Sequence, residues 1–192
     1  MEIYLLRHGQ TLQPGTYTGS TNVELSAEGR RQIAALSPFL QSIKFDNCFC
    51  SPLIRCVQTL SLLEVDSDPI FDESLKEIDF GSWEGLSFEQ VHKDFPDQLA
   101  DWGREGGEFS FPGGEMIRVF NSRVTGWLDN LLTKEFNRVL IVAHGGVIRI
   151  AICHLLGIDT ARAFAFNPME GRVAMVHVVD GFGQLEMLNC ID

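Results

Sequence analysis

Long apolar runs are missing from this sequence, and the longest, such as 139–143, are far too short to cross a bilayer. The chain also begins without the basic stretch and long apolar core of a signal peptide. It contains no recognisable internal repeat and no low-complexity linker. These absences lead us to expect a cytoplasmic protein that folds as a single domain over residues 1–192 and has no membrane partner.

Cysteine pairs with the spacing of a zinc or redox site are also absent. The five cysteines include no C-x-x-C, and the closest pair is Cys48 and Cys50 in FDNCFCS. A spacing of two places both side chains on one face of a strand. The odd count favours reduced, mostly buried thiols over a disulfide framework. The acidic segment 66–72 lacks the alternating ligands of a calcium loop, so no metal is expected there.

Basic residues are scarce, with 15 Lys and Arg against 26 Asp and Glu and a formal net charge of -11. This balance argues against a nucleic-acid partner, because such surfaces need clustered cations. Because the net charge is negative and repels anions, any anion that this protein binds must be held by a small local cluster of basic side chains. The 45% of hydrophobic residues is typical of a globular protein with a true core.

Apolar patterning and helix-start signals predict the fold. Strands are predicted at 2–6, 45–50, 138–143, 172–179 and 184–188. Helices are predicted to start after Ser26, at Ser51-Pro52, at Ser87 and near Glu115, and to span 147–156. This alternation predicts a three-layer α/β/α sandwich with a mainly parallel central sheet. The hairpin around Asp180-Gly181 predicts one antiparallel strand.

Residues 83–114 are predicted to form a small insertion, or lid, within this domain. Ser87 and Gln90 match a capping box for a short helix that Pro96 interrupts. The stretch 103–114 is rich in glycine and is predicted to be a surface loop. We expect this insertion to border the entrance for the substrate.

Polar residues follow three of the predicted strands. R-H-G stands at 7–9, SPLIR at 51–55, and H-G-G at 144–146. Ligands bind outside the carboxyl ends of the strands in an open α/β sheet. Two arginines and two histidines are therefore predicted to meet at this edge, beside helix starts that favour anions.

The residue types at this edge point to phosphoryl transfer. Arg7 and Arg55 offer forked donors that fit phosphate oxygens. A neutral histidine such as His8 can attack phosphorus. The reaction also needs an acid to protonate the leaving oxygen, and Glu77 or Asp79 in SLKEIDFGSWEG is the candidate.

Five ordered motifs resemble those of the histidine phosphatase superfamily, also called the phosphoglycerate mutase-like family. They are LLRHGQT, SPLIRCVQT, LKEIDFGSWEGL, FPGGE and IVAHGGVIR. Together with TGSTNVELSAEGRRQ, which resembles the loop and helix start after the first motif, they span most of the chain, from Glu2 to Arg149.

The resemblance implies a role for each motif residue. His8 would become a phosphohistidine, and Arg7, Arg55 and His144 would bind the phosphoryl group. Glu77 would protonate the leaving group and later take a proton from the attacking water. The resemblance implies neither a metal nor an organic cofactor, and the expected partner is a small-molecule phosphomonoester.

Several motif positions indicate which branch of the family this sequence resembles most. Ile78 and Phe80 stand where the mutases have an arginine and a tyrosine, and Gly146-Val147 stands where they usually have asparagine and serine. These differences favour net hydrolysis. The segment after Glu77 is similar to that of the α-ribazole phosphatases, which act in cobalamin assembly. Asn22, where the family commonly has an aspartate, is the expected contact to the substrate.

Several alternatives stay open at this point. The chain could be a broad-specificity or sugar-phosphate phosphatase, or a phosphoglycerate mutase. It could also be a binding or scaffold protein that keeps the fold without the activity, although the intact set of histidines, arginines and glutamate argues against this. The closing hairpin offers an edge strand through which a homodimer could form.

Overall fold

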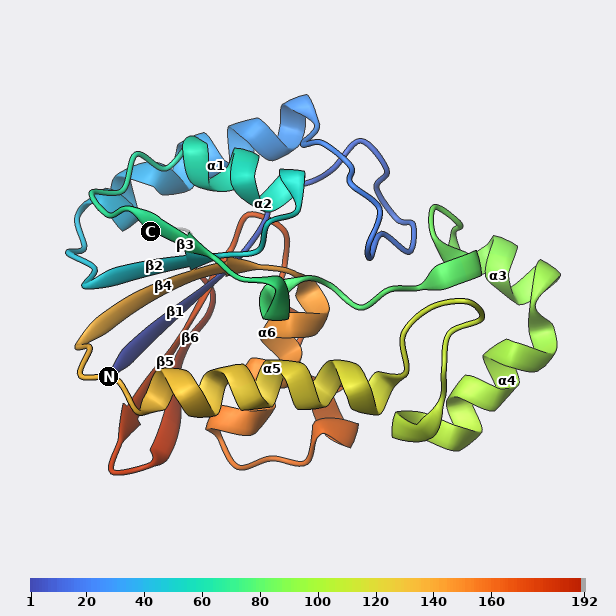
Figure 1. The fold of residues 1–192 in the computed structure, drawn as a ribbon. Coiled ribbons are helices and arrows are strands. Elements are labelled where there is room, and N and C mark those ends of the chain that lie inside the picture. The colour runs from blue at the N-terminus through green and yellow to red at the C-terminus, as the bar shows by residue number, and fades with distance from the viewer. Residues whose placement is uncertain (191–192) are drawn as a thin grey trace.

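The computed structural model describes residues 1–190 and contains one six-stranded mixed sheet (Figure 1). In chain order, the strands are β1 (Glu2–Arg7), β2 (Asn47–Cys50), β3 (Pro69–Phe71), β4 (Arg138–Ala143), β5 (Val173–Val179) and β6 (Phe182–Cys190). Their order in the sheet is β3-β2-β4-β1-β5-β6. The first four strands run parallel, and β5 is antiparallel to both of its neighbours. The predicted mainly parallel sheet with one antiparallel strand is confirmed.

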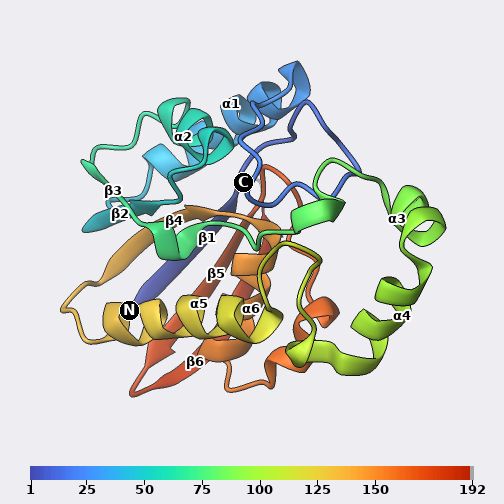
Figure 2. The same cartoon turned by 45° about the vertical axis from the view of Figure 1, so that its right-hand side comes forward.

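Helices cover both faces of the sheet. One face carries α1 (Ala27–Gln41) and α2 (Ile54–Ser61), and the other carries α5 (Ile117–Leu132) and α6 (Gly145–Leu155) (Figure 1). The helices α3 (Phe88–Asp94) and α4 (Pro96–Glu105) extend beyond one side of the sheet (Figure 2). Short 3₁₀ turns complete the chain: η1 (Glu73–Leu75), η2 (Gly81–Trp83), η3 (Gly106–Glu108) and η4 (Thr160–Ala165). The three-layer arrangement is as predicted.

The central strand β1 shows why the sheet is buried on both faces. Ile3 and Leu5 belong to the apolar core that also contains residues of α5 and α6. Tyr4 and Leu6 point the other way, into the core shared with α1 and α2. Because successive side chains of a strand alternate between faces, an almost continuous apolar run fills both cores. The polar residue that ends such a run, His8, is then fixed at the edge of the sheet.

The predicted start of α2 at Ser51-Pro52 is wrong. The helix begins at Ile54, whose backbone N–H donates to the side-chain oxygen of Asn22 at 2.6 Å. The Ser51 hydroxyl is instead within 2.8 Å of His144 Nε2. The same hydroxyl accepts a longer bond from Leu53 N–H at 3.4 Å, but Leu53 precedes the helix, so Ser51 caps no helical residue. The predicted N-cap at Ser26 and the capping box at Ser87 are both confirmed.

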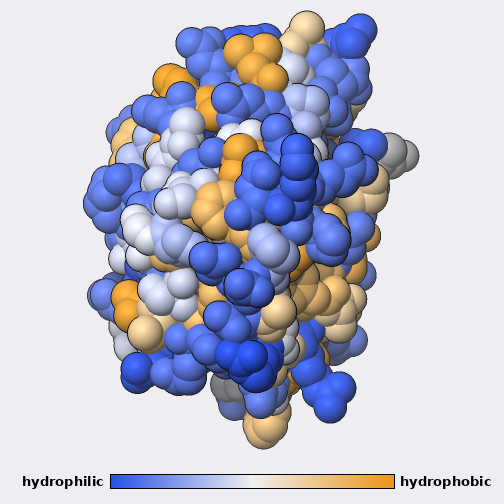
Figure 3. All heavy atoms as spheres, turned by 90° about the vertical axis from the view of Figure 1, so that its right-hand side faces the viewer, coloured by the Kyte–Doolittle hydropathy of each residue, from blue (hydrophilic) through white to orange (hydrophobic). Residues whose placement is uncertain are grey.

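The prediction of a surface loop over 103–114 is also wrong in part. The helix α4 continues to Glu105, and η3 follows it. Phe109 and Phe111 are then buried against Trp83 and Trp102. Glycine favours loops, but the aromatic residues between these glycines supply enough apolar area to anchor the segment. This side of the molecule, facing the viewer in Figure 3, is mainly hydrophilic, with apolar side chains showing between polar ones. Within residues 1–190, no helix has the length and apolar character needed to span a membrane.

Candidate active site

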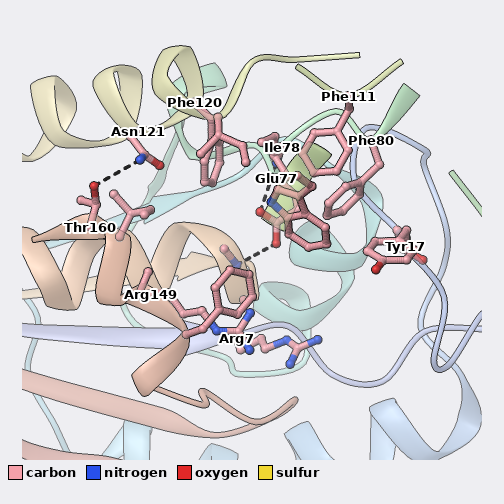
Figure 4. Close-up of a pocket in the computed structure, with 18 of the residues that line it drawn as sticks. Arg7, Tyr17, Glu77, Ile78, Phe80, Phe111, Phe120, Asn121, Arg149 and Thr160 are labelled. Atoms are coloured by element: carbon pink, nitrogen blue, oxygen red, sulfur yellow. Dashed lines mark hydrogen bonds between the residues drawn. The ribbon is translucent and has the colours of Figure 1, made fainter. Parts of the chain in front are cut away.

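A cavity of about 290 Å³ lies where β1 and β4 end. Arg7 comes from the end of β1, and Gly145 and Gly146 form the first turn of α6 directly after β4. Figure 4 shows Arg7 and Arg149 on one side of the cavity, and Tyr17, Phe80, Phe111 and Phe120 across from them. The aromatic residues that line it are Tyr17, Phe80, Trp102, Phe111, Phe120 and Phe164. The cavity thus joins a cationic edge to an apolar wall.

His8 follows Arg7 at the end of β1 and is buried there, and like Arg55 and His144 it is not among the residues that line the cavity. Its ring is held in one orientation. Its Nδ1 lies 2.8 Å from the backbone oxygen of Gly9, so Nδ1 must carry the hydrogen and donate it. Burial lowers the pKa of His8 well below its usual value, and the charges of Arg55 and Arg7 lower it further. The imidazole is therefore neutral near pH 7, and Nε2 keeps a free lone pair. A neutral ring with a free nitrogen has the form that a nucleophile needs.

His144 lies beside His8, with 5.2 Å between the ring centroids. Arg55 donates from Nε to His144 Nδ1 at 3.0 Å, which leaves the ring hydrogen on Nε2, facing the Ser51 hydroxyl. Burial is the main cause that lowers the pKa of His144 well below its usual value, and Arg55 adds to it. Both ring nitrogens are occupied, so contact with a phosphoryl group requires one of these bonds to be exchanged.

Arg55 is fully buried and is fixed by backbone oxygens. Its two terminal nitrogens donate to the carbonyls of Thr18, Gly19 and Thr21. Because a guanidinium has five N–H groups, four of these are now bound and one remains. Arg55 therefore supplies the site mainly with a fixed positive charge.

Arg7 is held differently and keeps a buried donor without a partner. It donates to the carbonyl of Pro168 at 3.0 Å and forms an ion pair with Glu170. Its Nε is buried and has no hydrogen-bond partner. A buried N–H that lacks a partner costs free energy, and an oxygen of a bound anion would satisfy it.

Glu77 reaches the cavity from the segment after η1. Its carboxylate accepts hydrogen bonds from the backbone of Gly146 at 2.9 Å and of Ile78 at 3.1 Å (Figure 4). A Cβ atom at position 146 would overlap this carboxylate, so a larger residue there would require the Glu77 side chain to shift. Gly146 thus leaves room for the carboxylate in the position that the structure shows.

A third arginine, Arg123 on α5, holds the segment that carries Glu77. It donates to the backbone oxygens of Lys76 at 2.7 Å and Glu77 at 3.1 Å, and it forms an ion pair with Glu115. These hydrogen bonds hold the backbone at Glu77 in place. Asp79, the other candidate acid, accepts a hydrogen bond from Gly81 N and does not line the cavity.

Asn22 does not line this cavity either, because its side chain caps α2. Sequence reasoning did not single out Arg149 or the pair Asn121 and Thr160, which do line it. Arg149 stands one helical turn after Gly145, and this spacing was the available signal. It donates to the carbonyl of Phe166 and lies over the ring of Phe164. Within residues 1–190, no carboxylate forms an ion pair with it.

Beyond this cavity lies a second hollow of about 660 Å³ between α4 and η4. Trp102, Ile117 and Phe164 are among the residues that line both spaces. Phe88, Leu99 and Gly103 of the predicted insertion line the outer one. Within the described part of the chain, no group of three or more histidine, cysteine or acidic side chains is arranged to hold a metal ion.

Comparison with known proteins agrees with this geometry. The chain matches the model of the histidine phosphatase superfamily (branch 1) over residues 3–191. Phosphoserine phosphatase 1 of Hydrogenobacter thermophilus is 28% identical, and the match covers 98% of this chain and 92% of that protein. The adenosylcobalamin/alpha-ribazole phosphatase of Escherichia coli is 27% identical, with 98% and 96% covered.

A solved structure with a similar sequence identity also matches this chain. The crystal structure of the alpha-ribazole phosphatase from Shigella flexneri has a TM-score of 0.91 and 27% identity to this chain. The match covers 99% of this chain and 96% of that one. The similar proteins thus share a fold and are named as phosphatases, but the substrates in their names differ.

Proposed function

This chain belongs to the histidine phosphatase superfamily, and from that premise we propose that it hydrolyses small-molecule phosphate esters through a phosphohistidine on His8. The observation that supports this most directly is the neutral His8 ring. Its hydrogen is bound to the Gly9 carbonyl, and its free Nε2 lies among the charges of Arg7 and Arg55. Those charges stabilise a phosphoryl group in transfer.

The proposed reaction has two steps. In the first, the lone pair of His8 Nε2 forms the N–P bond while the P–O bond to the leaving group breaks, and Glu77 gives its proton to the leaving oxygen. In the second, Glu77 takes a proton from water as the water oxygen attacks phosphorus and the N–P bond breaks. His8 returns to its neutral form. One carboxylate thus serves as acid and then as base.

For the substrate, we propose α-ribazole 5′-phosphate, with a role in cobalamin assembly. Two observations support it. The cavity wall opposite the cations is aromatic and suits a flat aromatic base. The chain is similar along almost its whole length to phosphatases named for this substrate. A broad-specificity phosphatase would have the same chemistry without this preference.

A second candidate substrate is a phosphomonoester whose leaving group carries a carboxylate. Arg149 favours it, because burial lowers the pKa of this guanidinium and no carboxylate of residues 1–190 pairs with it. A substrate carboxylate would supply the missing charge. Phosphoserine, the substrate in the name of one relative, is such a compound.

The test is phosphate release in EDTA from α-ribazole 5′-phosphate, phosphoserine, p-nitrophenyl phosphate, sugar phosphates and phosphoglycerates. We expect the highest kcat/KM for α-ribazole 5′-phosphate. Preference for phosphoserine, lost in Arg149→Met, would select the second candidate. Similar kcat/KM values for all these substrates would contradict a role in cobalamin assembly and would indicate a general phosphatase. Interconversion of 2- and 3-phosphoglycerate without phosphate release would contradict hydrolysis itself, and loss of activity in EDTA would contradict a metal-independent mechanism.

A further inference from the structure

We propose that Glu84 is a positioning residue of the active site, which holds Arg55 in place through the backbone of residues 18–21. Glu84 follows η2, at the beginning of the predicted insertion, and nothing in the chemistry above uses it. The inference rests on the proposed role of Arg55 as the fixed positive charge at the phosphoryl group. It adds a residue that sets where this charge lies.

The Glu84 carboxylate is surrounded by backbone N–H groups. It accepts hydrogen bonds from Gly19 at 3.1 Å, Ser20 at 2.8 Å and Thr21 at 3.3 Å. It also accepts one from Phe80 at 3.1 Å. Successive N–H groups that converge in this way form a concave anion site, and here the anion is a side chain of the protein.

The carbonyl groups of the same loop bind Arg55 on the opposite side. Arg55 donates to Gly19 O at 2.6 Å, to Thr21 O at 2.8 Å and to Thr18 O at 3.4 Å. The carbonyl of Thr18 and the N–H of Gly19 belong to one peptide group, and those of Gly19 and Ser20 belong to the next. Two consecutive peptide groups are therefore held between the guanidinium and the carboxylate.

This arrangement is an ion pair bridged by two peptide dipoles. Each peptide group points its oxygen at the cation and its N–H at the anion, so each charge strengthens the hydrogen bonds of the other. The position of Gly19 fits this role, because a Cβ atom there would overlap Glu84 and the carbonyl of Ile78. If the anion is removed, the loop loses its anchor and Arg55 loses its alignment toward His144.

The same carboxylate connects the two sides of the cavity. Phe80 belongs to the aromatic wall, and its backbone is bound to Glu84. Arg55 belongs to the cationic edge. A movement of the predicted insertion, residues 83–114, would therefore change the position of the Arg55 guanidinium through Glu84.

The test compares Glu84→Gln with a matched control, Asp46→Asn. Asp46 also accepts hydrogen bonds from two backbone N–H groups, those of Asn137 and Arg138, but it lies where β4 begins rather than where it ends. For each variant we would measure the binding of inorganic phosphate by calorimetry, kcat and KM for p-nitrophenyl phosphate, and the melting temperature. Glu84→Asp, which keeps the charge on a shorter side chain, serves as the conservative variant.

We expect Glu84→Gln to weaken phosphate binding and to lower kcat/KM by about tenfold or more, the size of one lost charged hydrogen bond. Glu84→Asp should retain part of the phosphate affinity and part of kcat/KM. Asp46→Asn should lower the melting temperature without changing phosphate binding or kcat/KM. The proposal is overturned if Glu84→Gln binds phosphate as the unaltered protein does, or if Asp46→Asn weakens binding equally. Because phosphate binding requires no turnover, this result is separate from the failure of the phosphohistidine mechanism.

Discussion

The two sides of the cavity are built by different physical means. On the cationic edge, Arg7 lines the cavity, and His8, Arg55 and His144 are buried next to the strand ends, where directional hydrogen bonds fix them. On the opposite wall, aromatic side chains from separate segments pack by ring contacts, such as Trp102 against Phe111 and Phe164. Hydrogen bonds demand fixed geometry, whereas apolar contacts tolerate changes of shape. We therefore expect the edge to hold the chemistry and the wall to hold the preference for substrate.

The largest effect is expected at His8. The change His8→Ala removes the nucleophile, and phosphate release should fall by roughly 10⁴-fold or more for every substrate. Acid-labile, base-stable phosphate should label the unaltered protein during turnover and should be absent from the variant. Equal loss for all substrates would support the separation of edge and wall. Phosphate release that survived the change would show that His8 is not the nucleophile.

A somewhat smaller effect is expected at Glu77. Glu77→Gln keeps the hydrogen bond from Gly146 but removes the transferable proton, and kcat should fall by about 10²–10⁴-fold for alkyl phosphates. The loss should be smaller for p-nitrophenyl phosphate, because nitrophenolate leaves without a proton. Asp79→Asn is the matched control, since this carboxylate binds Gly81 outside the cavity. An equal loss in both variants, or no dependence on the leaving group, would exclude Glu77 as the acid.

The difference between edge and wall also explains what could be predicted from the sequence. The end of a buried strand is a local signal, and it located His8 and His144 correctly at one edge of the sheet. The capping signal of Ser51 failed because its hydroxyl has a partner 93 positions away. The lining of the cavity by Phe164 had no local signal at all, because it depends on contacts between segments that are distant in the sequence.

A third prediction concerns the pH dependence of stability, which should arise at the edge. Burial, and then Arg55, lowers the pKa of both His8 and His144 in the folded protein well below 6.5. As the pH falls below this value, the unfolded chain binds protons that the folded protein does not. The free energy of unfolding should therefore decrease by about 1.4 kcal/mol per pH unit for each histidine.

Urea unfolding in phosphate-free buffer between pH 7.5 and 5.5 measures this decrease. The contribution of the two histidines is fully present above about pH 6.5 and is lost as the pH falls toward their folded pKa values. His144→Asn should remove about half of the slope. A free energy of unfolding that stays flat over this interval would show that the two rings are not held neutral by burial.

The smallest effect is expected at Phe164, which contacts both Trp102 of the aromatic wall and Arg149 of the cationic edge. This side chain lines both hollows and lies over Arg149, yet it is 71% exposed, so Phe164→Leu should leave the melting temperature nearly unchanged. The lost ring contacts are worth about 0.5–1.5 kcal/mol, and kcat/KM for aromatic phosphates should therefore fall by about 2- to 10-fold relative to ribose 5-phosphate.

Phe182→Leu, on β6 and 81% exposed, is the matched control and should leave this ratio unchanged. A change at Phe164 that lowered the rates for aromatic and sugar phosphates equally would mean that the wall also affects the chemical step. In that case edge and wall would act as one unit, and the link through Glu84 and Phe80 would be the first place to look for the coupling.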